Sequence, residues 1–232
     1  MNPGQRILSP RVLIGILFFI VVVPLLPLII SRHWDWLEAW AYAVISIAGF
    51  VISRLLASRR HPDIIAERAR FMQHEDTKTW DKRLIPILRN AGIATVAVAG
   101  LDELLGWSPS FSSLTKTLSF IFLIAGYALG SYALIENRFF SGTVRIQTDR
   151  GHRVVSGGPY RWIRHPGYAG GMLTYLATPL LLDSSWAMIP AIISAITMLY
   201  RTHLEDATLK SELPGYSAYA RKVRFRVLPG IW

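Results

Sequence analysis

The chain has 232 residues, of which 52% are hydrophobic and only 17% are charged, and its mean hydropathy is +0.34. This composition disfavours a water-soluble domain with a polar shell and favours an all-α, polytopic membrane protein. Cysteine is absent from the sequence, which excludes disulfides, cysteine-ligated metals and thiol nucleophiles. The formal net charge of +10 is compatible with nucleic-acid binding, but in a membrane protein the placement of the basic residues is more informative than their sum.

Six apolar runs follow one another along the chain, and a helix needs about 20 mostly apolar residues to cross a bilayer. The runs are Val12 to Ile30, Leu37 to Ala57, Leu84 to Leu105, Leu118 to Phe140, Tyr168 to Leu182 and Trp186 to Leu204. The first four are long enough to cross, although Arg89 and Asn90 interrupt the third and leave its crossing open. Only Asp183, Ser184 and Ser185 separate the last two, which predicts a tight helical hairpin. The prolines expected to bend these runs are Pro24, Pro27, Pro179 and Pro190.

Basic residues gather in alternate segments between the runs. They are Arg6 and Arg11 before the first run; Arg59, Arg60, Arg68, Arg70, Lys78, Lys82 and Arg83 in the second loop; Arg145, Arg150, Arg153, Arg161 and Arg164 in the fourth; and Arg221, Lys222, Arg224 and Arg226 in the tail. With six crossings, the tendency of basic loops to stay in the cytoplasm places both termini and every basic segment on the cytoplasmic side. The basic excess is therefore interpreted as a topology signal, and neither nucleic acid nor metal is expected as a partner.

Three polar segments are long enough to form structure outside the bilayer. The spacing in "PDIIAERARFMQ", within Ser58 to Arg83, predicts an amphipathic helix that lies on the membrane surface. The second segment is Ser141 to Gly167, and the third is the tail from Glu205 to Trp232, where aromatic residues stand among cations, as is typical of packing at the headgroup level. Because no repeat or linker divides the chain, we expect one integral membrane domain over residues 1–232.

General catalytic motifs are missing, which disfavours a P-loop ATPase, a zincin, an α/β-hydrolase and a Rossmann enzyme. The sequence has instead a set of polar residues at the predicted cytoplasmic face, in the last third of the chain. They are Gln147, His152, Tyr160, Arg164, His165, Tyr168, Arg201, His203, Glu205 and Asp206.

The string "RWIRHPGYAGG" places cations and a proline directly before an apolar run. Pro166 disfavours helical geometry at His165 and suits the first turn of a helix, so we expect a helix to begin close to Pro166. The first N–H groups of that helix, together with Arg161 and Arg164, predict an anion-receptive corner at the membrane surface. The alternative is that both arginines only anchor the topology.

Arg201 and Glu205 are four residues apart, so on a helix continuing from the last apolar run they lie on one face at its cytoplasmic end. One interpretation is an ordinary ion pair between the two. The other is that both face a polar cavity and bind a charged ligand. His203 points elsewhere on this helix and is expected at the surface, as is His152 when taken on its own.

Together these strings resemble the isoprenylcysteine carboxyl methyltransferase family, a group of integral membrane enzymes that use S-adenosylmethionine. The resemblance lies in Gln147, in "HRVVSGGPYRWIRHPGYAGG" (152–171), in "RTHLE" (201–205) and in "GYSAYARKVRFRVLPGIW" (215–232), with matching order and spacing. The earlier part of the chain matches only in spanning the membrane. The domain is therefore expected to combine N-terminal membrane helices (1–120) with a methyltransferase-like catalytic core (121–232).

The resemblance implies that S-adenosylmethionine is the cofactor and binds in a cytoplasmic pocket, while a lipophilic acceptor enters from the bilayer. It assigns the cofactor site to Gln147, His152, Arg153, Val154, Val155, Tyr160, His165, Pro166, Gly167, Tyr168 and Glu205. It also implies that Arg201 contacts the acceptor and acts with Glu205 in catalysis. This sequence departs from the family at Glu205 and Asp206, where several members carry a longer acidic run.

The chemistry of the residues agrees with this assignment. Methyl transfer from a sulfonium is an in-line displacement that depends on positioning and electrostatics. Glu205 can hold the cofactor's amino group, the corner at Pro166 can accept its carboxylate, and the fork of Arg201 can orient an acceptor carboxylate, which needs no general base. The leading interpretation is a membrane-embedded carboxyl methyltransferase acting on a prenylcysteine-type acceptor in the lipid bilayer. The alternatives are methylation of a phospholipid amine or a thiol, an NADPH-dependent sterol-type reductase, and a transporter or scaffold.

Overall fold

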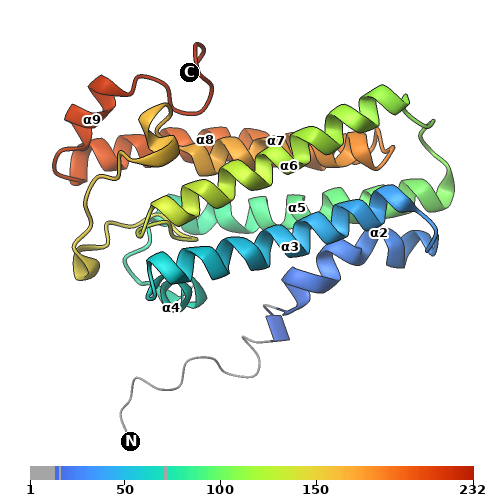
Figure 1. The fold of residues 1–232 in the computed structure, drawn as a ribbon, viewed down its shortest axis with the longest axis horizontal. Coiled ribbons are helices and arrows are strands. Elements are labelled where there is room, and N and C mark those ends of the chain that lie inside the picture. The colour runs from blue at the N-terminus through green and yellow to red at the C-terminus, as the bar shows by residue number, and fades with distance from the viewer. Residues whose placement is uncertain (1–13, 16, 71–72) are drawn as a thin grey trace, which may run out of the picture.

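The computed structural model describes residues 14–15, 17–70 and 73–232, and all regular structure within them is helical (Figure 1). In chain order the elements are the π-helical turn η2 (Phe18–Val22), α2 (Val23–Ser31), α3 (Leu37–Arg60), α4 (Ile64–Ala69), α5 (Thr79–Leu105), α6 (Ser113–Glu136), the 3-10 turns η4 (Thr148–Arg150) and η5 (Gly158–Arg161), α7 (Pro166–Leu181), α8 (Met188–Glu212) and α9 (Tyr216–Lys222). The all-α class predicted from the sequence is confirmed. Arg6, Arg11 and the start of the first predicted run at Val12 lie outside the described residues.

Helices α3, α5 and α6 are long and apolar enough to cross a membrane. They have 24, 27 and 24 residues, so each is about 36 to 40 Å long at a rise of 1.5 Å per residue. The run interrupted by Arg89 and Asn90 forms one continuous helix, and both of these side chains are exposed on it. Large apolar side chains such as Ile52 and Phe122 are also exposed on these helices, as expected for surfaces that face lipid.

The first predicted crossing is shorter in the described part of the chain, where η2 and α2 together cover Phe18–Ser31. Pro24 lies in the first turn of α2 and Pro27 lies inside it, so each removes a backbone N–H donor from the helix. The helix ends at Ser31, and the next residue, Arg32, has a φ of 60°, in the left-handed region. The chain then reverses, and α2 packs against α3 and α5.

The last two apolar runs form the predicted helical hairpin. Helices α7 and α8 pack against each other and are joined by residues 182–187 (Figure 1). Asp183 adopts a left-handed φ of 51° in this turn, and its carboxylate accepts the Phe111 N–H and pairs with Lys116. Pro179 lies inside α7, but Pro190 lies in the first turn of α8, where a missing N–H costs no helical hydrogen bond and no bend is required.

Helices α6 and α7 pack with their backbones nearly in contact. A Cβ atom placed on Gly170 would lie 2.5 Å from the carbonyl oxygen of Gly126 and 2.7 Å from the nitrogen of Gly130. Small residues at a helix interface allow this approach, which is common in membrane helix pairs. The packing holds the N-terminal end of α7 in a fixed place beside the end of α6.

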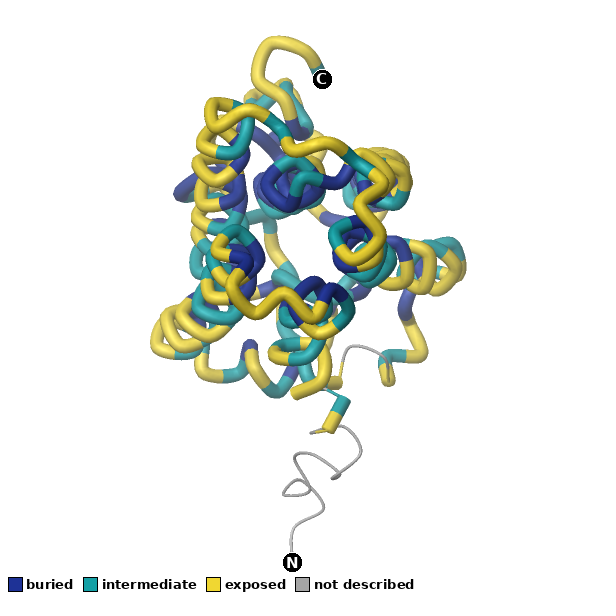
Figure 2. Tube along the Cα trace, turned by 90° about the vertical axis from the view of Figure 1, so that its right-hand side faces the viewer, coloured by how far each residue is buried: buried dark blue, intermediate teal, exposed yellow. Residues whose placement is uncertain are grey.

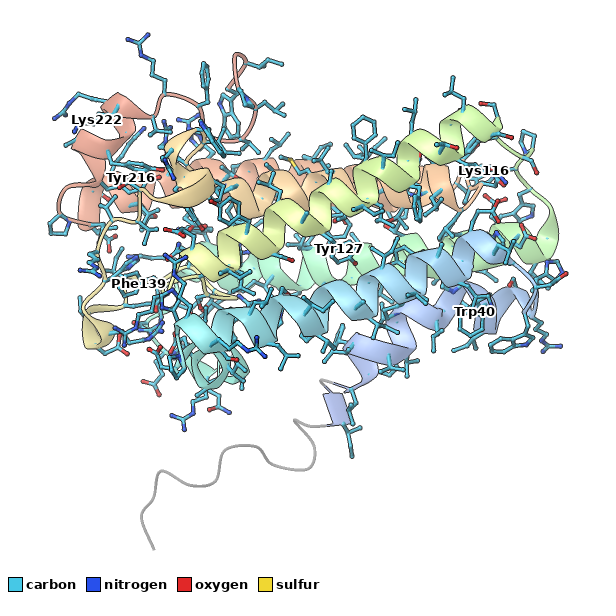
Figure 3. The ribbon with its side chains drawn as sticks, viewed as in Figure 1. Trp40, Lys116, Tyr127, Phe139, Tyr216 and Lys222 are labelled. Atoms are coloured by element: carbon cyan, nitrogen blue, oxygen red, sulfur yellow. The ribbon has the colours of Figure 1, made fainter. Side chains whose placement is uncertain are left out.

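The two ends of the bundle differ in polarity. Nitrogen and oxygen atoms gather at the end that carries Phe139 and Tyr216, which α4, the loop 137–165, α9 and the tail cover (Figure 3). Seen end-on, buried residues face the middle of the bundle and exposed residues face outward (Figure 2). The predicted surface helix is present only as the short α4, which turns Ile64 and Glu67 inward; residues 71–72 of the predicted segment lie outside the description.

Candidate functional site

A cavity of about 280 Å³ lies at the polar end of the bundle. The walls come from α4, the loop 137–165, α7, α8 and α9. Every predicted site residue except Pro166 lines it: Gln147, His152, Arg153, Val154, Val155, Tyr160, His165, Gly167, Tyr168, Arg201 and Glu205. Segments that are far apart in the sequence therefore meet around one space.

Pro166 contributes to the site through the backbone. It is buried as the first residue of α7, and His165 before it has φ −127° and ψ 61°, outside the helical region. The predicted helix start at Pro166 is confirmed. Gly167 and Tyr168, the next two residues, line the cavity.

Gln147 is buried and holds the loop in shape. Its amide Nε2 donates to the carbonyl oxygen of Phe139 at 2.7 Å, and its Oε1 accepts a hydrogen bond from Arg150. Its backbone N–H donates to Nδ1 of His152 at 3.3 Å, which leaves the His152 proton on Nε2. These bonds close the loop into a compact wall of the cavity.

His152 is half-buried and lies against Phe139, with the two ring centroids 4.7 Å apart. Burial, together with the positive charges of Arg145 and Arg150, lowers the pKa of His152 to about 4. The imidazole is therefore neutral at pH 7. His152 thus lines the cavity from the fourth loop, and His203 is exposed on α8 as predicted.

Tyr160 joins three elements of the cavity wall. Its hydroxyl donates to the carbonyl oxygen of Ala133 at 3.3 Å and accepts from Nδ2 of Asn137 at 3.2 Å, while its own carbonyl accepts from the Tyr219 hydroxyl at 2.7 Å. Burial raises the pKa of Tyr160, so the phenol stays protonated. The last turn of α6, the turn η5 and α9 are thereby connected.

Arg201 and Glu205 both line the cavity from the same face of α8, but they are not each other's ion pair. Nε and Nη2 of Arg201 donate to the two carboxylate oxygens of Asp81 at 2.6 and 3.0 Å, and Nη2 also donates to the carbonyl oxygen of Gly142 at 2.9 Å. The Asp81 carboxylate is completely buried and also accepts the Val144 N–H. A bidentate pair of this kind fixes the plane of the guanidinium.

Glu205 is half-buried and accepts a hydrogen bond from the hydroxyl of Tyr168. In the described part of the chain no Lys, Arg or His nitrogen lies within 4 Å of this carboxylate. The ring of Tyr168 lies 5.4 Å from the Arg201 guanidinium, so this tyrosine is close to both the cation and the carboxylate. Glu205 therefore presents a negative charge to the cavity without a cationic partner among the described residues.

The predicted anion-receptive corner is different from what was expected, because the two arginines are not available for it. Arg164 is buried; its Nε and Nη2 donate to Asp206 at 2.7 and 3.1 Å, and its Nη1 donates to the carbonyl oxygens of Val223 and Arg224, both at 2.7 Å. Arg161 is exposed and is not part of the cavity wall. The charge of Arg164 is therefore balanced by Asp206, and its hydrogen bonds hold the tail.

Asp206 connects α8 to the segment just before α7 and to the tail. Its carboxylate accepts hydrogen bonds from Arg164, Arg226 and the Tyr216 hydroxyl and forms an ion pair with Lys210. Backbone bonds from residues 164 and 165 to the carbonyl oxygens of residues 225 and 226 run beside it. Asp206 is thus fully engaged in holding these segments together, whereas Glu205 faces the cavity.

Several lining residues had no signal of their own in the sequence. They are Arg68 on α4, Asn137, Phe139, Phe140 and Arg145 in the fourth loop, and Tyr216 and Tyr219 on α9. The two tyrosines lie in the tail string 215–232, which carries part of the family resemblance but assigns neither of them to the site. Nothing in the local pattern around Arg68 pointed to a cavity more than 60 residues along the chain.

The fold and the cavity together define a polytopic helical membrane protein with a polar, aromatic-lined cavity at one end of its bundle. Residues 118–211 match the model of the isoprenylcysteine carboxyl methyltransferase (ICMT) family. The resemblance found in the sequence is thus confirmed over a segment that runs from α6 through most of α8. All predicted site residues lie within it.

Two further comparisons concern whole proteins. A solved structure of the eukaryotic intramembrane Ras methyltransferase ICMT is 18% identical, covers 99% of this chain and 90% of its own chain, and has a TM-score of 0.49. A comparison with curated proteins finds no match.

Among the described residues, no group of three or more His, Asp or Glu side chains is placed to hold a metal ion.

Proposed function

We propose that this protein is a membrane methyltransferase that transfers a methyl group from S-adenosylmethionine to the carboxylate of a lipophilic, prenylcysteine-type acceptor. The observation that carries the proposal is the convergence of the predicted cofactor residues, from Gln147 to Glu205, on one cavity. The family match over residues 118–211 supports the same reaction class. The bundle around the cavity is that of a membrane protein, which suits an acceptor with a lipid chain.

The cavity suits a donor that carries positive charge. When bound, S-adenosylmethionine supplies a methyl group made transferable by its sulfonium. Glu205 offers a carboxylate without a cationic partner among the described residues, which suits the donor's amino group. His152 is neutral at pH 7, so it adds no repulsion, and Phe139 and Tyr160 provide aromatic surface for an adenine ring.

The acceptor needs orientation and no general base, because a carboxylate is already ionised near neutral pH. Arg201 lines the cavity and is held in one orientation by Asp81, so its role is to fix the geometry of the acceptor side. The remaining chemistry is in-line displacement, which depends on how donor and acceptor are placed relative to each other. Catalysis by this chain would therefore come from positioning and electrostatics.

The first test is calorimetric titration of the detergent-solubilised protein with S-adenosylmethionine. We expect saturable binding that Glu205→Gln weakens about tenfold or more, because a charge-assisted contact with the donor is lost. His203→Gln is the matched control, since His203 is exposed on the same helix two residues away, and it should leave the affinity unchanged. Absence of saturable binding to folded wild-type protein would falsify the proposal.

The acceptor class is tested with the same material. A prenylated cysteine acid, a phospholipid amine and a small thiol are each supplied with radiolabelled donor, and the labelled product is identified. Label in a base-labile ester supports carboxyl methylation. Label in an amine or thioether would overturn the proposed carboxylate acceptor but would still support S-adenosylmethionine as the methyl donor. Displacement of the donor by NADPH, with reduction of a sterol-type substrate, would indicate the reductase instead.

A further inference from the structure

The arginines of the cavity wall differ in how their charge is balanced. Five arginines line it, and three of them are paired with carboxylates in the structure: Arg145 with Glu67, Asp76 and Asp149; Arg164 with Asp206; and Arg201 with Asp81. Arg153 is exposed, where water stabilises its charge. Arg68 is the remaining one.

Arg68 is half-buried and has no carboxylate partner. Its Nη1 donates a long hydrogen bond of 3.3 Å to the carbonyl oxygen of Phe140, and its guanidinium lies 5.4 Å from the Phe140 ring. Every Asp and Glu of the chain lies among the described residues, and none of them has an oxygen within 4 Å of Arg68. A cation removed from water without a counter-charge is unfavourable, so this position favours an anion supplied from outside.

The guanidinium groups of Arg68 and Arg201 lie on the same side of the cavity. Arg68 donates to the carbonyl oxygen of Phe140 and Arg201 to that of Gly142, two residues further along one short segment. Burial, together with the positive charge of Arg201, lowers the pKa of Arg68 to about 10. Asp81 offsets the charge of Arg201, whereas the described residues supply no anion for Arg68.

We propose that Arg68 binds the carboxylate of the acceptor and selects acceptors that carry one, with Arg201 beside it. This inference rests on the proposed function and adds to it a residue outside the segment that matches the family. It divides the charges of the cavity between the two substrates: Glu205 faces the cationic donor and Arg68 faces the anionic acceptor. The fork of an arginine suits a carboxylate, because two N–H groups can donate to its two oxygens.

The test compares an S-farnesylated N-acetylcysteine with its carboxamide, which lacks the negative charge. Their dissociation constants are measured directly, without turnover, on full-length protein saturated with S-adenosylmethionine. We expect wild type to bind the acid about tenfold or more tightly than the amide, and Arg68→Gln to reduce this preference to near one. The acceptor KM should rise by a similar factor in Arg68→Gln, while donor affinity stays within about twofold of wild type.

Arg70→Gln is the matched control, because Arg70 is exposed at the end of the same helix, and it should bind both compounds as wild type does. An Arg68→Gln protein that binds the donor normally and still prefers the acid overturns the inference. If Arg68→Gln misfolds and loses donor binding, Arg68→Lys is used in its place. We expect the acceptor KM of Arg68→Lys to be severalfold higher than that of wild type. An unchanged KM would overturn the inference.

Failure of the proposed function has a different signature. Wild type that prefers the acid but never methylates it overturns the methyltransferase proposal and leaves the Arg68 site standing. Wild type that binds donor but shows no preference for the acid overturns Arg68 as a carboxylate site and also the choice of a carboxyl acceptor.

Discussion

The Asp81 side chain decides what Arg201 can do. Arg201 was identified by its spacing from Glu205, yet two of its guanidinium nitrogens donate to a carboxylate 120 residues away. Asp81 joins α5 to α8 and, through the Val144 N–H, to the fourth loop. One buried carboxylate thus orients the arginine and ties two segments of the cavity wall, α8 and the fourth loop, to α5.

Asp81→Asn should be strongly destabilising, because it leaves the Arg201 guanidinium buried beside a neutral amide. Removal of one partner from a buried ion pair costs about 3 to 5 kcal/mol. The expected result is a clearly lower unfolding temperature in detergent, measured with and without S-adenosylmethionine. Arg83→Gln, at an exposed position of the same helix, should change stability by less than about 0.5 kcal/mol. Equal stability of Asp81→Asn and wild type would contradict the buried pair.

His152 should make the folded protein sensitive to moderate acid. Its pKa is lowered to about 4 by burial and by Arg145 and Arg150, while the unfolded chain takes up the proton below about pH 6.5. The unfolded state therefore binds more protons between these values, and folding stability falls as the pH falls from about 6.5 to 4. Above pH 6.5 both states are neutral at this position and the contribution disappears.

The measurement is the unfolding temperature from pH 8 to pH 4.5 for wild type and His152→Gln. The variant should lose less stability than wild type on acidification, since its side chain cannot take up the proton. His33→Gln serves as the comparison, because His33 is exposed and belongs to the opposite end of the bundle. Parallel curves for wild type and His152→Gln would show that the imidazole is not held neutral.

At the level of helices, the contact between α6 and α7 positions the site. Helix α7 begins with the residues that line the cavity, and its distance from α6 is set by glycines that leave no room for a side chain. The hairpin of α7 and α8 then carries Tyr168 and Glu205 to within hydrogen-bonding distance. Precision at the cavity therefore depends on packing in the middle of the bundle.

Gly170→Ala should shift α7 away from α6. The added Cβ would meet backbone atoms of α6 at 2.5 and 2.7 Å, and backbone cannot move aside as a flexible side chain can. Overpacking of this kind costs about 1 to 3 kcal/mol. We expect a lower unfolding temperature and weaker donor binding, both measured in detergent. Gly130→Ala is the control, because a Cβ there has no atom within 4 Å, and it should behave as wild type.

Nitrogen and oxygen atoms gather at one end of the bundle, and short turns join the helices at the opposite end (Figure 3). The cavity and the basic residues of the fourth loop and the tail belong to the first of these ends. Basic segments tend to remain in the cytoplasm, so this asymmetry predicts that the cavity opens there. Asp183, in the turn between α7 and α8, pairs with Lys116 near the start of α6, which keeps the helix ends together there. A donor that is made in the cytoplasm would then reach the cavity without crossing the bilayer.

The absence of cysteine makes this orientation directly measurable. Ser156→Cys lies in the exposed part of the cavity-side loop, and Ser110→Cys is exposed in the turn before α6. In intact cells, a membrane-impermeant maleimide should label the cysteine at position 110 and should label the one at position 156 only after lysis. The reverse pattern would show that the cavity faces outward.

Much of the fold and the site was predictable because their signals are local. Long apolar runs require helices in a bilayer, a short polar interval between two such runs requires a hairpin, and Pro166 defines a helix start. The order of the strings between Gln147 and Glu205 was sufficient to group the residues that line one cavity. The amphipathic helix was expected to be longer than α4, since a pattern shows which face is apolar but not where tertiary contacts end a helix.

The sequence by itself determined the membrane class, the helical hairpin and part of the cavity wall, from Gln147 to Glu205. Only the tertiary structure decided how the charges are paired: Arg201 with Asp81, Arg164 with Asp206, and Arg68 with no carboxylate. The reason is physical. The hydropathy of a segment depends on consecutive residues, so it can be calculated from the sequence. The partner of a buried charge depends instead on which distant segments the packed helices bring within a few ångströms.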